Sequence, residues 1–236
     1  MYRMLRASAV LIAFLLNVGV LRAQTAPDPS GHWEGIVQVP GMDVAFELDF
    51  AKNSTGVAGT VGIPAQKLSG LPLRSVVVDG RSIKFQARTD QSFDGTIAED
   101  GGSISGSYYV DGAAVPFTMT RKGEARITPP VTSAPIGREL EGRWTATSAR
   151  GTRLELTMEN RPDGTATGII ANLNEGGLQI PVKIVQDGVR VTLDVAVLGG
   201  SYAATLNASG TELSGTYTDA SQSAPLTFTR SGAAKP

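Results

Sequence analysis

The chain carries two copies of one sequence pattern, and this duplication limits its fold more than any other feature. Both halves open on Gly-x-Trp, at Trp33 and Trp144, and both close on Pro-x-Thr-x-Thr-Arg, at Arg121 and Arg230. Matched positions recur between those ends at a nearly constant spacing: Gly59 with Gly168, Pro72 with Pro181, Ile104-Ser105-Gly106 with Leu213-Ser214-Gly215, and Tyr108 with Tyr217. A tandem repeat means that each copy is one structural unit. The sequence therefore predicts two similar domains in series.

The matched ends also set the domain boundaries. We expect one copy at residues 29–122 and the other at residues 138–231. The segment 123–137 between them holds three prolines and shows little apolar periodicity. Such a composition is typical of a semi-rigid linker.

Apolar residues alternate with polar or small residues along both copies, for example at 44–50 and 154–158. This alternation is the pattern of a strand with one buried face. Asp-Gly pairs fall between the alternating segments, at 79–80, 100–101, 111–112, 163–164 and 187–188. Because glycine supplies the positive φ of tight hairpins, we interpret these aspartates as turn residues. Calcium binding is the alternative, but their spacing differs from that of an EF-hand loop.

The strands between turns number about eight per copy, and they are joined mostly by hairpins. A meander of this kind has to protect its edge strands, and closure into a barrel does so most simply. The predicted fold is therefore all-β, with two tandem up-and-down meander β-barrels of about eight strands each, calycin-like, after an N-terminal signal peptide. A sandwich, or an open sheet packed against its twin, is the alternative.

The first 23 residues predict export. Arg3 and Arg6 form a basic region, residues 7–20 are apolar, and Ala23 offers a small residue for cleavage, so residues 1–23 have the layout of a secretory signal peptide. A retained anchor is the alternative, but the apolar run is shorter than the ~20 residues of a spanning helix. The chain has no cysteine for lipid attachment. We expect a periplasmic or secreted protein with no membrane span after processing.

Charge and composition argue against several classes of protein. The formal net charge is −1, and loss of the arginine-containing signal peptide makes the mature chain more acidic. Without a basic run or stripe, nucleic-acid binding is not expected. With one histidine and no cysteine, neither a metal site nor a cofactor is expected. The absence of disulfides means that each domain depends on its apolar core or on its partner domain.

Catalysis is not expected either. The segment 102–106 comes nearest to the Gly-x-Ser-x-Gly elbow of a hydrolase, but Ile104 stands where the nucleophile would be. General-base chemistry at neutral pH usually uses histidine, and the single His32 has no counterpart in the second copy. Paired carboxylates could serve a glycosidase, yet the acidic residues lie mostly in turns or at solvent-facing positions such as Glu47 and Glu155.

Each copy pairs a tryptophan on its first strand with an arginine on its last. Arg121 and Arg230 share strand parity with the apolar residues two and four positions earlier, so each should point to the buried face. In a closed meander the first and last strands are neighbours, which sets Arg121 over Trp33 and Arg230 over Trp144. Such a contact contributes about 0.5 to 2 kcal/mol. We interpret the four residues as structural plugs. The arrangement resembles that of the lipocalin and avidin barrels and implies their architecture.

A second resemblance covers nearly the whole mature chain. The first copy shows a Gly-x-Trp-x-Gly start, a Gly-x-x-Gly turn, a Pro-x-Gln stretch, a Leu-Pro-Leu, an Asp-Gly turn and a closing Pro-to-Arg strand: Gly31, Trp33, Gly35, Gly56, Gly59, Pro64, Gln66, Leu71-Pro72-Leu73, Asp79-Gly80, and 116–121. This order is similar to the β-rich N-terminal accessory domain of secreted bacterial α/β-hydrolases. The second copy departs from it at Asn172-Leu173-Asn174, where the Pro-x-Gln would fall.

Two functions fit these predictions. In the first, the protein is an exported, non-catalytic binding module that holds a small apolar ligand in a barrel. The second copy has the smaller interior residues, and its candidate ligand-binding residues are Leu156, Met158, Val195, Tyr202, Ala204, Tyr217 and Phe228. In the second, both barrels are filled and the protein is an accessory module for a secreted or periplasmic hydrolase. The loops at 62–70 and 171–179 would then lie at one rim of each barrel and contact the partner.

Overall fold

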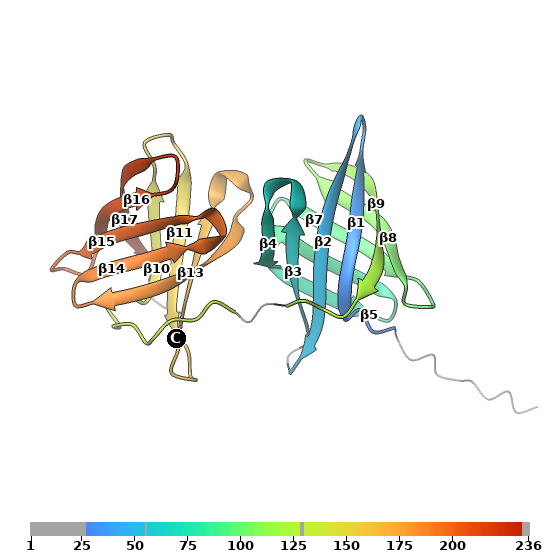
Figure 1. The fold of residues 1–236 in the computed structure, drawn as a ribbon, viewed down its shortest axis with the longest axis horizontal. Coiled ribbons are helices and arrows are strands. Elements are labelled where there is room, and N and C mark those ends of the chain that lie inside the picture. Colours follow the sequence, from blue (N-terminus) through green and yellow to red (C-terminus); the bar gives the residue numbers. More distant parts are fainter. Residues whose placement is uncertain (1–26, 55, 128–129, 233–236) are drawn as a thin grey trace, which may run out of the picture.

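The structure is a computed structural model that describes residues 27–54, 56–127 and 130–232. Within these ranges nearly all regular structure is β-strand, and the two repeats lie side by side (Figure 1). The all-β prediction is confirmed. The predicted signal peptide, residues 1–23, lies outside the described residues. In the part of the chain that the structure describes, no helix is long and apolar enough to cross a membrane.

Repeat 2 is a closed antiparallel barrel in which each strand pairs with the next along the chain and the last pairs with the first. Its strands are β10 (Gly142–Thr147), β11 (Arg153–Asn160), β12 (Ala166–Asn172), β13 (Leu178–Asp187), β14 (Arg190–Val195), β15 (Gly200–Leu206), β16 (Glu212–Thr218) and β17 (Ser223–Gly232). This is the eight-stranded up-and-down barrel that the turn spacing predicts.

Repeat 1 is a single curled sheet of nine strands in the order β4-β3-β2-β1-β9-β8-β7-β6-β5. Its strands are β1 (Gly31–Val39), β2 (Met42–Asn53), β3 (Gly56–Ile63), β4 (Leu68–Pro72), β5 (Ser75–Asp79), β6 (Ser82–Arg88), β7 (Gln91–Ile97), β8 (Ser103–Val110) and β9 (Ala113–Gly123). Strands β1 and β9 are neighbours, as the barrel prediction requires. Strands β4 and β5 do not pair with each other, so they are the two edges of the sheet and the barrel is not closed there.

The two edge strands of repeat 1, β4 and β5, together correspond to one strand of repeat 2, β13. There β13 pairs with β12 along its first half and with β14 along its second half. In repeat 1 the same path is divided between β4, which pairs with β3, and β5, which pairs with β6. The nine strands of repeat 1 are therefore the eight of repeat 2 with one strand split in two.

One additional residue lies at the split. Asp79 lies seven residues after Pro72, whereas Asp187 lies six residues after Pro181. The backbone N–H of Arg74 donates to the carbonyl of Gln86 at 2.7 Å, and the next residue, Ser75, also pairs with Gln86. Two residues thus face one across the ladder, which is a β-bulge. The bulge bends the strand away from β3.

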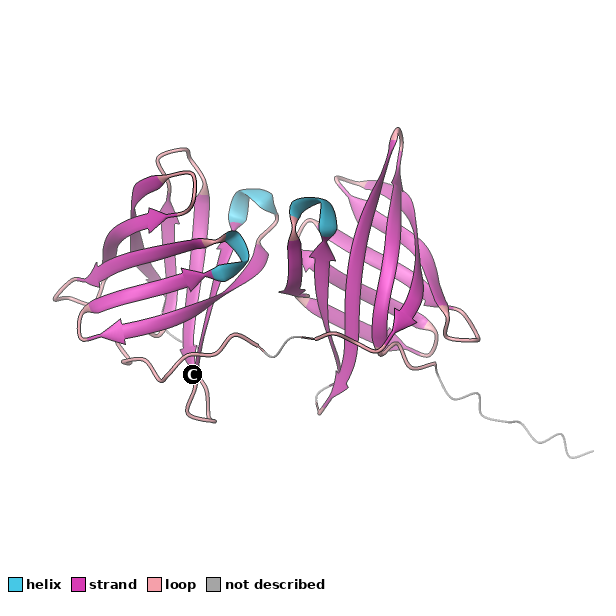
Figure 2. Cartoon of the chain, in the orientation of Figure 1, coloured by secondary structure: helices cyan, strands magenta, loops and turns pink. Residues whose placement is uncertain are grey.

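Short 3₁₀ turns lie at the rims, as Figure 2 shows. They are η1 (Pro64–Gln66), η2 (Leu173–Glu175) and η3 (Ala196–Leu198). The first two occupy the predicted loops at 62–70 and 171–179 and lie at equivalent places in the two repeats. Lys67 follows η1 with a φ of 56°, and Gly176 follows η2 with a φ of 66°.

Each repeat encloses its own hydrophobic cluster. In repeat 1 the cluster is rich in phenylalanine: the rings of Phe85 and Phe93 stack with centroids 4.5 Å apart, and Phe117 meets both edge-on. In repeat 2 it is mainly aliphatic, packed around Trp144 and Tyr202. Aromatic side chains bury large apolar areas, and the chain has no cysteine, so apolar packing of this kind stabilises both repeats.

The segment that joins the repeats packs against both of them. The N–H of Arg126 donates to Asp49 of repeat 1 at 2.7 Å. Farther along, Ser133 exchanges two main-chain hydrogen bonds with Ala166 of β12. Ile136 is buried in the hydrophobic cluster of repeat 2. Although 123–137 is the predicted linker, its second half therefore packs as part of repeat 2.

The repeats also contact each other directly. The backbone N–H and the hydroxyl of Thr89 donate to the carbonyl of Gly176 at 2.7 and 3.1 Å. Arg74 Nη1 donates to the carbonyl of Gly177 at 3.1 Å. Leu178 is buried in the hydrophobic cluster of repeat 1 and not in that of its own repeat. The loop before β13 thus packs against repeat 1 beside the bulge.

Candidate functional site

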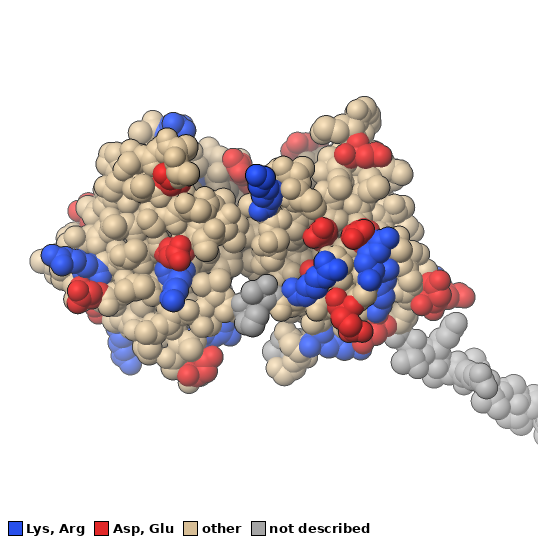
Figure 3. Space-filling view, in the orientation of Figure 1, with Lys and Arg blue, Asp and Glu red and all other residues tan. Residues whose placement is uncertain are grey.

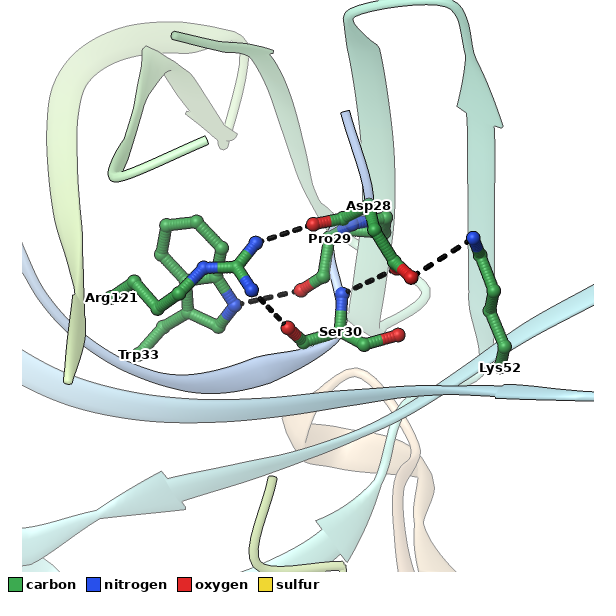
Figure 4. Close-up of polar contacts among 6 residues, drawn as sticks. All are labelled: Asp28, Pro29, Ser30, Trp33, Lys52 and Arg121. Carbon is green, nitrogen blue, oxygen red and sulfur yellow. Dashed lines mark hydrogen bonds and ion pairs between the residues drawn. The ribbon is translucent and has the colours of Figure 1, made fainter. Parts of the chain in front are cut away.

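Trp33 and Arg121 lie together at one end of repeat 1, beside the chain that leads into β1 (Figure 4). The guanidinium carbon of Arg121 is 4.8 Å from the centroid of the indole. Trp33 is fully buried, and its Nε1 donates to the carbonyl of Pro29 at 2.9 Å. The Arg121 guanidinium donates to three main-chain oxygens, those of Asp28, Ser30 and Gly101.

A carboxylate extends this arrangement toward the surface. Asp28 Oδ1 accepts from the N–H of Ser30 at 3.0 Å, and Asp28 Oδ2 pairs with Lys52 at 3.0 Å (Figure 4). The pKa of Asp28 is lowered to about 2, chiefly by the hydrogen bond from the Ser30 N–H and to a smaller extent by Lys52. The carboxylate therefore stays ionised at neutral pH and holds the chain entering β1.

Repeat 2 reproduces the same geometry. The guanidinium carbon of Arg230 is 4.2 Å from the centroid of Trp144. Trp144 Nε1 donates to the carbonyl of Leu140 at 2.9 Å, which is again the residue four positions earlier. The Arg230 guanidinium donates to the main-chain oxygens of Glu139, Glu141 and Gly210. The guanidinium donors in both repeats thus bind protein carbonyls, an arrangement suited to holding a strand end in place.

The candidate ligand residues of repeat 2 lie together in the barrel interior. Five of them are among the most deeply buried side chains of this repeat: Leu156, Met158, Val195, Tyr202 and Phe228. Ala204 is 8% exposed, and Tyr217 packs against the cluster from the rim. Sequence pattern thus placed these residues on one wall face, where they contact one another.

Tyr202, on β15, is buried in the interior of this barrel and reaches the two strands that follow it. Its hydroxyl lies between β16 and β17, 2.7 Å from the carbonyl oxygen of Leu213 and 2.9 Å from that of Leu226. Its ring meets Phe228 edge-on with centroids 5.5 Å apart. Burial raises the pKa of Tyr202 well above its ordinary value, so the neutral phenol persists. A side chain tied to the wall in this way fills space that a ligand would need.

The rim of repeat 2 is also closely packed. A Cβ added at Gly200 would overlap the hydroxyl of Tyr217, so glycine at this position makes room for the phenol. Burial raises the pKa of Tyr217, and the carboxylate of Asp219 adds to that effect. In repeat 1 the equivalent Tyr108 tilts against Phe93 with centroids 4.6 Å apart. The two tyrosines matched in the sequence thus occupy matching places at the two rims.

His32, the single histidine, lies on the outer face of β1 under the chain that follows β9. It is only 2% exposed, and its Nδ1 is 3.0 Å from Asp49 Oδ1, which also accepts from the N–H of Arg126. Its Nε2 is buried and has no hydrogen-bond partner. A substrate cannot reach this ring without displacing the chain that covers it.

Two hollows on the described surface lie on repeat 1, and both open to solvent. One, of about 270 Å³, lies over β5 to β8 and is lined by Lys84, Asp94 and Tyr109 among others, with Lys84 and Asp94 paired at 2.6 Å. The other, of about 370 Å³, lies beside Asp28 and Arg121. Acidic and basic side chains are interspersed on the face drawn in Figure 3, which shows no basic stripe.

Sequence pattern did not identify the residues that join the parts of the molecule. Ser133 and Ile136 lie in a proline-containing segment without periodicity, and Leu178 belongs to the alternating run of repeat 2. The one signal for Ile136 was an isolated large apolar residue directly after Pro135. No sequence signal indicated the role of Leu178, because this residue contacts the other repeat.

The fold and the repeated Trp–Arg pair define a tandem protein of the small β-barrel class. No family model and no curated protein matches the chain. A solved structure of a candidate outer membrane protein from Bacteroides fragilis is 11% identical, with a TM-score of 0.27, over 86% of this chain and 97% of that chain. A protein of unknown function from the DUF3598 family of Nostoc punctiforme is 12% identical, with a TM-score of 0.24, over 84% and 94%. Likenesses this distant bear on no function.

Proposed function

We propose that the chain is an exported, non-catalytic interaction module whose barrels are filled and whose rims contact a partner protein. The filling of the interiors carries this proposal. A small barrel either packs its own side chains inside or holds one ligand. In repeat 1 the interior is occupied by stacked rings such as Phe85 and Phe93, and in repeat 2 by Tyr202, which is hydrogen-bonded to the wall.

Further observations support the non-catalytic and exported parts of the proposal. His32 is buried beside Asp49, which removes the usual general base from solvent. The predicted signal peptide at 1–23 supports export to the periplasm or the medium. The resemblance to the accessory domain of secreted α/β-hydrolases supports a hydrolase of that compartment as the partner.

The rim of repeat 1 offers a surface for such a partner. The β1–β2 hairpin rises above the rest of the repeat (Figure 1), and Met42 at its tip is 66% exposed. The equivalent turn of repeat 2, residues 148–152, reads Ser-Ala-Arg-Gly-Thr. Exposed apolar residues on a projecting loop favour a contact with another protein.

Native mass spectrometry tests the filled interiors. The protein purified from the host that exports it should have the mass of the bare processed polypeptide. A small molecule that stays bound through purification, and is lost when Tyr202 is changed to Ala, would favour a ligand carrier and contradict the proposal. Ester hydrolysis by the pure protein that a single substitution abolishes would contradict the non-catalytic part.

Crosslinking in the exporting host tests the rim. A photo-crosslinking residue at Met42 should capture one dominant partner, whereas the same residue at Val189, which is 56% exposed in the β13–β14 turn, should not. Mass spectrometry of the adduct then identifies the partner. Equal capture at both positions would show non-specific contact and contradict a role for the rim.

A further inference from the structure

In repeat 1, residues 56–58 of β3 and 75–79 of β5 form no ladder with each other, and we call the line between them the seam. In repeat 2 a segment of the chain occupies the equivalent place. In the closed barrel, β12 and the second half of β13 diverge, and residues 133–137 lie between them. Ser133 pairs with Ala166 on one side, and its hydroxyl accepts from the N–H of Ile184 on the other at 2.7 Å. An extended segment thus completes the wall of repeat 2.

Side chains at the base of this seam hold the same segment. Asn160 accepts from the N–H of Ile136 at 2.9 Å and donates to its carbonyl at 2.8 Å. Gln186 accepts from the N–H of Gly137 at 2.7 Å. With the segment in place, Ala166 and Ile184 are 0% and 3% exposed.

In repeat 1 the matching positions carry partly exposed valines. Val57 stands where repeat 2 has Ala166, and Val76 and Val78 stand where it has Ile184 and Gln186. All three valines are only partly buried against the cluster of repeat 1. Asn160 is replaced by Lys52. The strand positions of the repeat 1 seam are therefore all valine, and Lys52 beside them is paired with Asp28.

The backbone of β5 is also available on this side. Asp79 and Ser82 flank a two-residue hairpin loop, so the N–H groups of Val77 and Ser75 point toward β6. Those of Val76 and Val78 then point into the seam, as the N–H of Ile184 does in repeat 2. Strand β5 is an edge of the sheet, and a sheet edge is a template for an added strand.

The predicted cleavage after Ala23 would leave a chain before repeat 1 that matches the filling segment of repeat 2 poorly. Counting back from the paired tryptophans Trp33 and Trp144, Arg22 matches Ser133 and Thr25 matches Ile136. Cleavage after Ala23, as the signal peptide predicts, removes the residue that would pair with β3 and leaves a threonine in place of the isoleucine. This mismatch favours an occupant from another chain.

We propose that the β3–β5 seam of repeat 1 binds an extended peptide segment of a partner protein, which adds a strand to β5. The segment that fills repeat 2 indicates its chemistry: a serine or threonine to bind the β5 backbone, followed three residues later by a β-branched apolar residue over the valines. Val78 in place of Gln186 favours a second apolar residue next to it. This proposal rests on the proposed function, because it names the kind of partner that an exported interaction module takes.

A labelled synthetic peptide with the sequence of residues 131–140 tests the seam in the full processed chain. Fluorescence anisotropy should detect binding that falls by about tenfold or more when both Val76 and Val78 are changed to Lys. The matched control is Val77→Lys, because Val77 lies on the same strand, is 59% exposed and faces away from the seam. A peptide with Asp in place of Ile136 should bind about tenfold more weakly.

Hydrogen exchange of the unaltered protein locates the peptide without relying on a variant. Slowed exchange at 56–58 and 75–79 supports the proposal, and slowed exchange confined to repeat 2 overturns it. Binding that appears only after residues 24–26 are deleted assigns the seam to the chain's own N-terminus and overturns it. A dimer that the peptide dissociates assigns the seam to a second copy and also overturns it. Failure of the peptide to bind overturns the seam proposal but not the proposed function, which native mass spectrometry and crosslinking at Met42 test independently.

Discussion

The two repeats share a plug but differ in their walls. Each tryptophan donates from Nε1 to the carbonyl four residues earlier, and each arginine stacks on it and binds the carbonyls around the first strand. The wall is continuous along β13 in repeat 2 but divided between β4 and β5 in repeat 1. The first and last strands pair in both repeats, although the wall of repeat 1 is divided elsewhere.

The repeats also differ in what packs beside that divided wall. Residues 133–137 complete repeat 2, whereas repeat 1 receives Leu178 and the carbonyls of Gly176 and Gly177 from its neighbour. Repeat 2 is thus completed by chain that belongs to it, whereas repeat 1 is contacted by another domain beside its divided wall. The comparison teaches that the second copy of a duplicated domain can gain its closing segment from the linker, which the first copy lacks.

Removal of the tryptophan that both repeats share should have the greatest effect on stability. Trp144→Ala should lower the free energy of unfolding of repeat 2 by about 3 to 5 kcal/mol, and Trp33→Ala should do the same in repeat 1, because both indoles are fully buried. Urea denaturation of the full chain, with hydrogen exchange to assign each transition to a repeat, measures both. Effects within error in either repeat would show that the plug there is not structural.

Sequence could predict the features of the two repeats that depend on neighbouring residues or on the repeated pattern. Alternation at 44–50 and the Asp-Gly turns fixed strand faces and hairpins, and the shared parity of Arg121 with its apolar neighbours placed it over Trp33. These features depend on residues near in sequence or on a repeated pattern. The filled interior of repeat 2 depends on the hydrogen bonds that Tyr202 makes to β16 and β17, which its position in the pattern does not specify.

The division of the ladder in repeat 1 could not be predicted from the alternating pattern. The additional residue is visible when Pro72–Asp79 is compared with Pro181–Asp187, but alternation alone does not say whether a bulge divides a ladder or is absorbed within it. The contact of Leu178 with repeat 1 has no local signature, since a leucine facing its own barrel and one facing a neighbour look the same in an alternating strand.

The next prediction concerns the segment that completes repeat 2. Ile136→Ala should lower the stability of repeat 2 by about 3 kcal/mol, because Ile136 is only 6% exposed within the cluster of that repeat. Val131→Ala in the same segment is the control: Val131 is 39% exposed, and a change below about 0.5 kcal/mol is expected. Chemical denaturation of the two variants makes the comparison. Equal effects would mean that 133–137 is a spacer and not part of the wall.

Leu178 allows a test of the contact between the repeats. Leu178→Ala should destabilise repeat 1 by about 2 kcal/mol, although the residue belongs to repeat 2, because its side chain packs in the cluster of repeat 1. Hydrogen exchange should therefore speed up in β4 and β6 more than in β15 and β16. The control, Leu173→Ala, changes a residue of η2 that is 40% exposed and should leave both sets unchanged. Faster exchange confined to repeat 2 would contradict the docking.

A small pH-dependent contribution to stability is expected from the carboxylate beside each Trp–Arg pair. Asp28 and its counterpart Glu139 both have lowered pKa values, Asp28 through the Ser30 N–H and Glu139 through its own N–H and Gln186. A carboxyl with a pKa of about 2, below its ordinary 3.8, stabilises the folded state above about pH 4 and loses that contribution as the pH falls toward 2.

Asp28→Asn should therefore cost less than about 1 kcal/mol at neutral pH, because the side chain of Asp28 is 50% exposed and its pair with Lys52 is screened by water. The difference from the unaltered protein should shrink as the pH falls toward 2, because a carboxyl with a pKa of about 2 is then about half protonated. Denaturation at neutral pH and near pH 2 measures this difference, with Glu139→Gln as the matched variant in repeat 2. A cost that persists at the acidic end would mean that the shape of the side chain, and not its charge, holds the chain entering β1.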